Sequence, residues 1–209
     1  MLTWYGCLAH GATQSSYGDT LQESVLPPIK CMCLLCDKLS GSFRGNASTR
    51  YGQRHEGQAL EEYLQHQQLQ APSFCLSPSA LVVKEDTLWL AVTLNAMATD
   101  PSAGVGVVEV KCPHLCREKQ LKSAALNSSF CLCSRGGALS LRRSRPYFYQ
   151  VQHQMYVCDV EYADFVVWTP HELFVQRVAR DRAFFDDVFL RLKDFYFGHL
   201  LPALYSEIL

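Results

Sequence analysis

A short run of β-branched residues at positions 106–111 constrains the fold of this 209-residue chain more than any other feature. It reads Gly-Val-Val-Glu-Val-Lys, which predicts a β-strand, and Pro113 marks its end. Side chains alternate between the two faces of a strand, so Glu109 and Lys111 should share one face while the neighbouring valines enter an apolar layer on the other. A carboxylate and an ammonium group are costly to bury without a purpose, so this pair is the first candidate for a functional site.

The elements predicted around this strand alternate between helix and strand. Apolar residues at helical spacing, β-branched runs and turn residues predict helices over 49–68, 146–157 and 182–204, and strands over 74–83, 88–93, 106–111 and 162–168. Residues 84–87 are predicted to be a hairpin turn, and residues 127–145, which lack periodicity, a mobile loop. This order predicts an α/β fold with one sheet between helices.

Composition fits a single globular domain. Hydrophobic residues make up 48% of the chain and charged residues 19%, proportions typical of a folded protein. Residues 1–45 contain helix-breaking and loop-forming residues, so we expect a poorly defined N-terminal segment there and one domain over residues 46–205. No apolar run reaches the length of a membrane span, and the first residues lack a secretory signal pattern. We therefore expect an intracellular protein, nuclear or cytoplasmic and not secreted, with no membrane contact.

The ten cysteines allow two interpretations. Disulfides are disfavoured in an intracellular protein, so most of these residues are expected to be ordinary buried thiols. Cys33 and Cys36 have the spacing of one zinc knuckle, but no second Cys-x-x-Cys follows at a suitable distance. A zinc site therefore remains the less favoured alternative.

Basic residues are concentrated in one part of a chain whose formal net charge is -1. Between positions 111 and 150 there are eight basic residues and one acidic residue, Glu118. A local basic segment is typical of a surface that meets phosphate groups. The alternative is a solvated basic loop without a partner.

The Glu-x-Lys pattern alone is weak evidence for catalysis. Glu109 has the chemistry to bind a hard divalent ion such as Mg²⁺, and Lys111 has the charge to orient an attacking water molecule. The alternative is an exposed edge strand whose polar face carries an ion pair worth at most ~1 kcal/mol. So short a motif favours the second interpretation when it is taken by itself.

Two further motifs change this balance. Residues 49–57 read TRYGQRHEG, and residues 146–155 read PYFYQVQHQM. Together with the EVKCP strand at 109–113, they resemble the YqaJ-like viral recombinase family, relatives of phage-type alkaline exonucleases within the PD-(D/E)xK nuclease superfamily. The similarity runs from about residue 46 to residue 204. It implies a restriction-endonuclease-like fold, in which a mixed central sheet is flanked by helices.

The resemblance implies a metal-dependent DNA nuclease of the exonuclease type, which hydrolyses phosphodiester bonds with Mg²⁺ or Mn²⁺. Glu56 would hold the metal or its water, and Glu109 would bind the metal with help from the Val110 carbonyl. Lys111 would orient the nucleophilic water and stabilise charge on phosphorus. Gln150 and Gln152 would project from the helix toward the site or the DNA.

The implied partner is DNA, expected to be linear and double-stranded. Gln152 and Tyr156 match a Gln-x-x-x-Tyr spacing found in related exonucleases. The basic segment would line the mouth of the DNA groove through Arg135, Arg142, Arg143 and Arg145. Some phage relatives form ring-shaped trimers, so the resemblance leaves an oligomer open.

One position departs from the family pattern. Residues 89–96 read WLAVTLNA where the family has WLAASPDG, so Asn95 stands in place of the metal-binding aspartate. An amide keeps an oxygen but loses the full negative charge by which hard cations are largely held. We therefore expect weak metal binding and strongly reduced or absent cleavage. Asp100 is a candidate substitute ligand, and the alternative function is a catalytically inactive domain that binds DNA or a protein partner.

Overall fold

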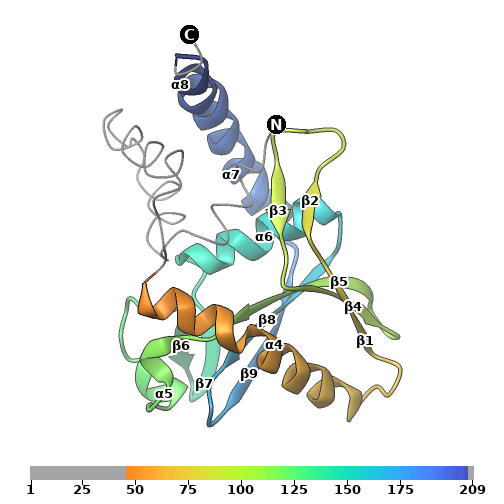
Figure 1. The fold of residues 1–209 in the computed structure, drawn as a ribbon, viewed down its shortest axis with the longest axis vertical. Coiled ribbons are helices and arrows are strands. Elements are labelled where there is room, and N and C mark those ends of the chain that lie inside the picture. The colour runs from red at the N-terminus through yellow and green to blue at the C-terminus, as the bar shows by residue number, and fades with distance from the viewer. Residues whose placement is uncertain (1–45, 207–209) are drawn as a thin grey trace.

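The computed structural model describes residues 46–206, which form a mixed five-stranded sheet with helices on both faces (Figure 1). Strands β5 and β8 are parallel and the other neighbouring strands are antiparallel. Across the sheet the order is β1 (Cys75–Pro78), β4 (Ala96–Asp100), β5 (Gly104–Lys111), β8 (Tyr162–Trp168) and β9 (Leu173–Ala179). The predicted mixed central sheet flanked by helices is confirmed.

Two helices cover the two faces of the sheet. Helix α4 (Ala47–Gln68) packs on the face that includes Val108 and Val110, and it buries Ala59 and Tyr63 there. Helix α6 (Pro146–Cys158) lies across the other face, against a core that includes Val107 and Phe165. The alternation predicted for β5 therefore holds, because Glu109 lies on the α6 face and its neighbouring valines lie on the α4 face.

Local sequence signals explain where these helices begin and end. The Asn46 side chain caps α4 by accepting a 2.9 Å hydrogen bond from the Thr49 N–H. Pro146 occupies the first turn of α6, where its missing N–H has no consequence. At the other end Asp159 adopts a left-handed conformation with φ of 52°, which stops the helix.

The C-terminal helical region is longer than one regular helix. The Asp181 side chain caps α7 (Arg182–Phe195), and a π-helical turn, η2 (Tyr196–Leu200), joins it to α8 (Leu201–Ser206). Together they form a projecting rod in Figure 1, which agrees with the helix predicted over 182–204. Among residues 46–206, no helix combines the length and hydrophobicity that crossing a membrane requires.

The predicted strand over 74–83 is in fact two strands in different sheets. Residues 75–78 form β1 of the central sheet, whereas β2 (Leu81–Val83) pairs with β3 (Ala91–Thr93) in a separate hairpin. The chain changes partner directly after Pro78, which has no N–H to continue a ladder. The predicted turn at 84–87 is confirmed inside the β2–β3 connection, where the Thr87 N–H bonds the Lys84 carbonyl.

The prediction of a mobile loop over 127–145 is wrong. This segment contains the hairpin of β6 (Leu132–Arg135) and β7 (Ala138–Leu141), turned by Gly136 and Gly137, both at positive φ. Before it come the short helices η1 (His114–Cys116) and α5 (Leu121–Ala124). Two adjacent glycines between short strands were a hairpin signal in the sequence.

Candidate functional site

Glu109 and Lys111 lie at the carboxyl end of β5, in the centre of the sheet. Glu109 is 3% exposed, and the Lys111 Nζ forms an ion pair with its Oε1 atom. β5 is hydrogen-bonded to β4 on one side and β8 on the other. The interpretation of this pair as the polar face of an exposed edge strand is therefore wrong.

Helix α6 brings two glutamines to this carboxylate. Gln150 Nε2 donates a 2.7 Å hydrogen bond to Glu109 Oε1, and Gln154 Nε2 donates a 2.6 Å bond to Glu109 Oε2. Residues four apart lie on one face of a helix, so both amides reach the same carboxylate. The predicted proximity of Gln150 agrees with this geometry. Gln154 was missed, although its spacing from Gln150 was a usable signal.

Asn95 joins the same cluster from the start of β4. Its Oδ1 atom accepts a 2.9 Å hydrogen bond from the backbone N–H of Val110, the residue between Glu109 and Lys111. Antiparallel pairing of β4 with β5, in which Ala96 lies opposite Val108, fixes this position. We call the side chains of Asn95, Glu109, Lys111, Gln150 and Gln154 the Glu109 cluster.

Tyr147 and Thr93 border the Glu109 cluster. The Lys111 Nζ lies 4.5 Å from the centre of the Tyr147 ring, which is a cation–π contact. Gln154 Nε2 also lies 3.2 Å from the carbonyl oxygen of Thr93. An aromatic face and a backbone carbonyl thus restrict the movement of both donors.

Glu56 approaches the end of β5 from the opposite face of the sheet. It lies on α4, near Cys112, whose pKa is raised to about 12 by burial and, second, by the charge of Glu56. On the same helix the His55 ring stacks on Trp168, with ring centres 5.3 Å apart, and its Nδ1 lies 2.8 Å from the carbonyl oxygen of Tyr51. Glu56 is therefore near the chain that follows Lys111, but it belongs to a different layer from Glu109.

Gln152 does not reach the Glu109 cluster. Its Nε2 donates to the Ala179 carbonyl at 3.0 Å, and its Oε1 accepts from the Asp181 N–H at 2.7 Å. Residues two apart on a helix do not face the same way, so Gln150 and Gln152 separate to different sides of α6. Tyr156, its partner in the predicted spacing, stacks on Phe185 at 4.6 Å. Both side chains fix α6 against neighbouring elements.

The four predicted DNA-contacting arginines have different environments. The Arg142 guanidinium donates to the carbonyl oxygens of Leu132 and Ala125, each at 3.0 Å. Arg145 likewise donates to a backbone carbonyl, that of residue 128. These two arginines hold the hairpin segment in place.

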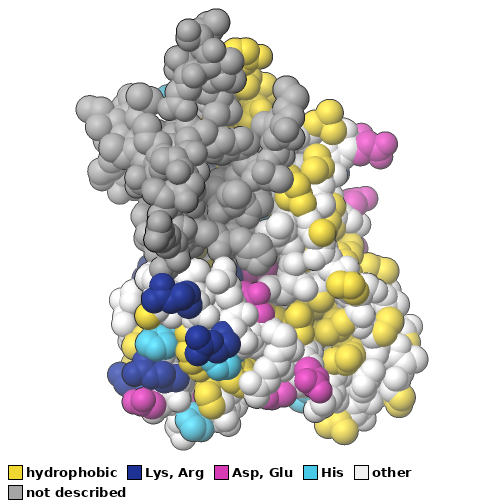
Figure 2. Space-filling view, in the orientation of Figure 1, with side chains coloured by type: hydrophobic (Ala, Val, Ile, Leu, Met, Phe, Trp, Pro, Cys, Tyr) yellow, Lys and Arg dark blue, Asp and Glu magenta, His cyan; other side chains and the backbone are white. Residues whose placement is uncertain are grey.

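The other two arginines face solvent. Arg143 is exposed, pairs with the Asp181 carboxylate and lies 4.5 Å from the centre of the Phe148 ring. Arg135 is exposed at the β6–β7 turn. Lys and Arg side chains also gather, with histidines, over the α4 and α5 side of the face shown in Figure 2. Exposed residues of these elements include Arg54 and Lys122.

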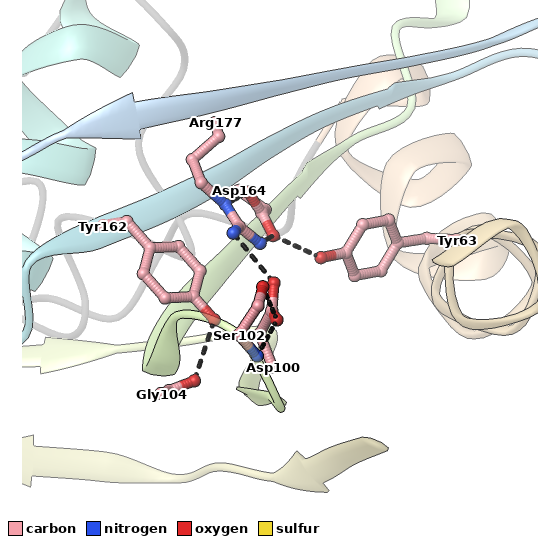
Figure 3. A network of polar contacts seen from close by, with 7 residues as sticks. All are labelled: Tyr63, Asp100, Ser102, Gly104, Tyr162, Asp164 and Arg177. Carbon is pink, nitrogen blue, oxygen red and sulfur yellow. Dashed lines mark hydrogen bonds and ion pairs between the residues drawn. The ribbon is translucent and has the colours of Figure 1, made fainter. Parts of the chain in front are cut away.

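Asp100 belongs to another cluster, at the far end of β4 (Figure 3). Its carboxylate accepts hydrogen bonds from the Ser102 hydroxyl and N–H, and from Arg177 at 2.8 Å. These contacts, with those of Ser102 first, lower its pKa to about 2. Arg177 also bonds both carboxylate oxygens of Asp164 at 2.9 Å, and Tyr63 donates to Asp164 at 2.6 Å. The less favoured possibility that Asp100 substitutes as a ligand does not hold, because a strand length separates it from Asn95.

A model of the YqaJ-like viral recombinase domain matches residues 3–161. The chain belongs to this family. The family resemblance expected from the three motifs is thereby confirmed. No curated protein matches the chain.

Solved structures similar to this YqaJ-family chain include two exonucleases. An alkaline exonuclease from Laribacter hongkongensis has 18% identity and a TM-score of 0.65, and the match covers 96% of this chain and 94% of that one. The same enzyme in complex with dAMP gives 16% identity and a TM-score of 0.65 over 97% and 95% of the two chains. A phage-related exonuclease from Haemophilus somnus 129PT gives 14% identity and a TM-score of 0.59 over 98% and 95%. At these identities the likeness shows the fold alone.

The side chains of this YqaJ-family site do not fit a hard divalent cation as they stand. Among residues 46–206, no three histidine, cysteine, aspartate or glutamate side chains come together as a metal site. The Asn95 oxygen is bonded to the Val110 N–H, and both Glu109 oxygens face positively polarised donors. Cys33 and Cys36, on which the less favoured zinc alternative rested, lie outside the described residues, and the six described cysteines are free thiols.

Proposed function

We propose that this YqaJ-family domain is a DNA nuclease of the exonuclease type whose hydrolysis of phosphodiester bonds is strongly weakened by Asn95. The observation that carries this proposal is the Glu109–Lys111 pair, held by Gln150 at the carboxyl end of the central strand. The likeness of the whole fold to an alkaline exonuclease supports it. Dependence on Mg²⁺ or Mn²⁺ is part of the proposal for the Asn95→Asp chain; in the natural chain we expect binding too weak to detect, because an amide replaces a carboxylate.

The proposed roles follow the positions of the side chains. Lys111 is half-buried, so its ammonium group is near enough to solvent to meet a phosphate and stabilise charge that develops on phosphorus. Gln150 keeps Glu109 oriented through its 2.7 Å hydrogen bond. The proposed substrate is linear double-stranded DNA, with Arg135 and Arg143 as solvent-facing contacts to its backbone.

Digestion of end-labelled linear duplex DNA with Mn²⁺ tests this function. The natural chain is compared with Asn95→Asp and Lys111→Ala, and Lys193→Ala, an exposed lysine on α7, is the matched control. We expect slow or undetectable digestion by the natural chain, digestion restored by Asn95→Asp, and no effect of Lys193→Ala. Far-UV circular dichroism confirms that each variant is folded.

The outcomes separate the alternatives. Activity of the natural chain that is abolished by Lys111→Ala supports a working nuclease despite the amide. If the natural chain does not digest DNA and Asn95→Asp does, the result supports an inactivated nuclease with an otherwise intact site. If none of the folded chains digests DNA, the nuclease proposal is overturned.

A second candidate function is DNA binding without cleavage. The observation that favours it is the hydrogen bond from the Val110 N–H, which occupies the only side-chain oxygen of Asn95. We expect the natural chain to bind a fluorescent duplex in EDTA, measured by anisotropy, with an affinity that falls as salt rises. Absence of salt-dependent binding in a folded protein argues against this second function.

A further inference from the structure

We propose that the Glu109 cluster of this chain is a charge-balanced polar centre that is complete without a divalent cation, with Lys111 as the counter-ion of Glu109. The inference rests on the proposed function for the identity of the site, and it goes further by stating what replaces the cation. It predicts that the natural domain folds with the same stability whether or not Mg²⁺ or Mn²⁺ is present.

The first step is the orientation of Asn95. The Val110 N–H is a donor, so only the amide oxygen of Asn95 can lie 2.9 Å from it. The amide nitrogen therefore takes the place of the second oxygen that an aspartate would have. If the Asn95 amide were flipped, its NH₂ group would face the Val110 N–H, and two hydrogen-bond donors would oppose each other. Asn95 thus presents two N–H hydrogens, which repel a cation, where a carboxylate would present an acceptor.

The second step is the state of Glu109. Its Oε1 atom receives the Lys111 ammonium and the Gln150 amide, and its Oε2 atom receives the Gln154 amide. The side chain of Glu109 is 4% exposed and that of Lys111 is 18% exposed, so solvent screens the pair little. A buried carboxylate is tolerated when it is paired and hydrogen-bonded, and here protein groups meet both conditions.

The third step is the net charge of the cluster. The negative charge of Glu109 and the positive charge of Lys111 cancel. The side chains of Asn95, Gln150 and Gln154 are neutral. An aspartate at position 95 would add an unbalanced negative charge to a mostly buried centre. Adding a cation to the natural cluster would instead require it to displace the Lys111 ammonium from Glu109. The natural residue therefore favours the cation-free state, and aspartate would favour the cation-bound state.

One fully buried atom of this cluster lacks a hydrogen-bond partner among the described residues. Gln154 is 1% exposed, and its Oε1 atom has no hydrogen-bond partner among the described residues. An amide oxygen carries no net charge, and hard cations are held largely by charge. This acceptor leaves room for a further hydrogen bond, and it does not replace the missing carboxylate.

Thermal unfolding across a Mn²⁺ titration tests the inference. The natural chain, Asn95→Asp and a matched control, Asn127→Asp, are unfolded in EDTA and then with rising MnCl₂. Asn127 is exposed and outside the cluster, so its substitution makes the same chemical change in solvent. We expect no change in the Tm of the natural chain or the control. Asn95→Asp should have a lower Tm in EDTA and gain about 5 to 10 °C at Mn²⁺ roughly a hundredfold above its dissociation constant.

A saturable rise in the Tm of the natural chain, of the size expected for Asn95→Asp, overturns the inference. This measurement needs no variant, so the inference stays falsifiable even where Asn95→Asp does not fold. Calorimetric titration of the natural chain with MnCl₂ gives a second readout, in which specific heat of binding contradicts the inference and its absence supports it. The nuclease proposal fails by a different result. If the Asn95→Asp chain binds Mn²⁺ but does not cut DNA, the nuclease proposal is overturned and the inference about the cation is unaffected.

Discussion

Asp164 is buried to 1% exposure, and both of its carboxylate oxygens have partners. It pairs with Arg177, and it accepts a hydrogen bond from Tyr63 of α4, whose pKa is raised by burial and then by the charge of Asp164. The three side chains join β8, β9 and the helix that covers the sheet. Their geometry is that of a structural clamp, and it lies on the α4 face of the sheet, opposite to the face of the Glu109 cluster, with Asp164 paired to Val108.

Replacing this carboxylate tests the clamp. Asp164→Asn leaves donors of Arg177 and Tyr63 facing an amide nitrogen. Because the Arg177 side chain is 37% exposed, the loss is expected to be at most about 3 kcal/mol. Asp187→Asn is the control, because Asp187 pairs with Arg191 on exposed helix surface, where such pairs contribute about 0.5 kcal/mol or less. Urea unfolding measures both changes, and equal losses would contradict the clamp.

At the residue scale, the sequence located the centre of the candidate site but not all of its contacts. Glu109, Lys111 and Asn95 were expected together, and strand alternation was sufficient to place the first two. Gln152 was expected at the site because a motif gives spacing without direction around the helix. Gln154 was overlooked for the same reason. The direction of each side chain follows from how α6 is rotated on the sheet, which the linear motif does not contain.

At the element scale, Gly106 shows how closely β5 and β8 approach. A Cβ atom added at Gly106 would lie 2.3 Å from the Tyr162 ring, too close for any real contact. The ring has little freedom to move, because the Arg177 guanidinium lies 3.9 Å from its centre and its hydroxyl bonds the Gly104 carbonyl. Glycine is required here by space, since only glycine lacks the Cβ atom.

Two glycine-to-alanine substitutions test this close approach. Gly106→Ala is expected to cost about 2 kcal/mol or more of unfolding free energy through overpacking. Gly57→Ala in α4 meets nothing within 4 Å and should stabilise by about 0.5 to 1 kcal/mol, because alanine loses less backbone entropy in a helix. Denaturant midpoints give both values. A Gly106→Ala chain as stable as the natural one would show that the Tyr162 ring moves freely.

The elements that the sequence predicted are those with strong local signals. β5 is rich in valine and β8 in aromatic residues and valine, and α4 and α6 begin with a capping asparagine and a proline. β4 and β9 were missed because their sequences, AMATD and LFVQRVA, carry small or charged residues. Arg177 of β9 is a strand residue because it pairs with Asp164 of β8, a tertiary contact that local propensity does not reveal.

At the scale of the whole molecule, one buried histidine links stability to pH. His153 lies in α6 at 2% exposure, stacked on Phe185 at 5.6 Å, and burial lowers its pKa to about 3. The unfolded chain takes up a proton near the ordinary pKa of 6.5, whereas the folded chain does not. Stability supplied by the neutral ring is therefore present above pH 6.5 and is lost as the pH falls below it.

This linkage predicts a measurable slope. Between pH 6.5 and 5, His153 should contribute a loss of about 1.5 kcal/mol in unfolding free energy. His153→Leu should remove that contribution, whatever its effect on stability at neutral pH. Urea unfolding at several pH values compares the slopes. This window lies above the range in which carboxylates with lowered pKa, such as Asp100, begin to take up protons. Parallel slopes for the two proteins would contradict the prediction.

The extent of the domain is a remaining prediction. The predicted boundary at residue 46 coincides with the Asn46 cap of α4, whereas the family match begins at residue 3. The sequence signals for a boundary were turn residues, and these do not show whether a segment packs on the domain. The assignment of residues 46–205 as the domain therefore stays a prediction.

The parallel pairing of β5 with β8 has a consequence for biosynthesis. Val107 pairs with Ala163, so the central ladder joins parts of the chain separated by η1, α5, the β6–β7 hairpin and α6. During translation β5 leaves the ribosome with β4 already available but without its second neighbour. The edge of β5 that pairs with β8 stays unpaired until β8 is synthesised. Closing the long loop between the two strands is slow compared with forming a hairpin. A nascent chain stalled before residue 162 would expose this edge, so β5 lacks its second neighbour for the whole interval between the synthesis of β5 and that of β8.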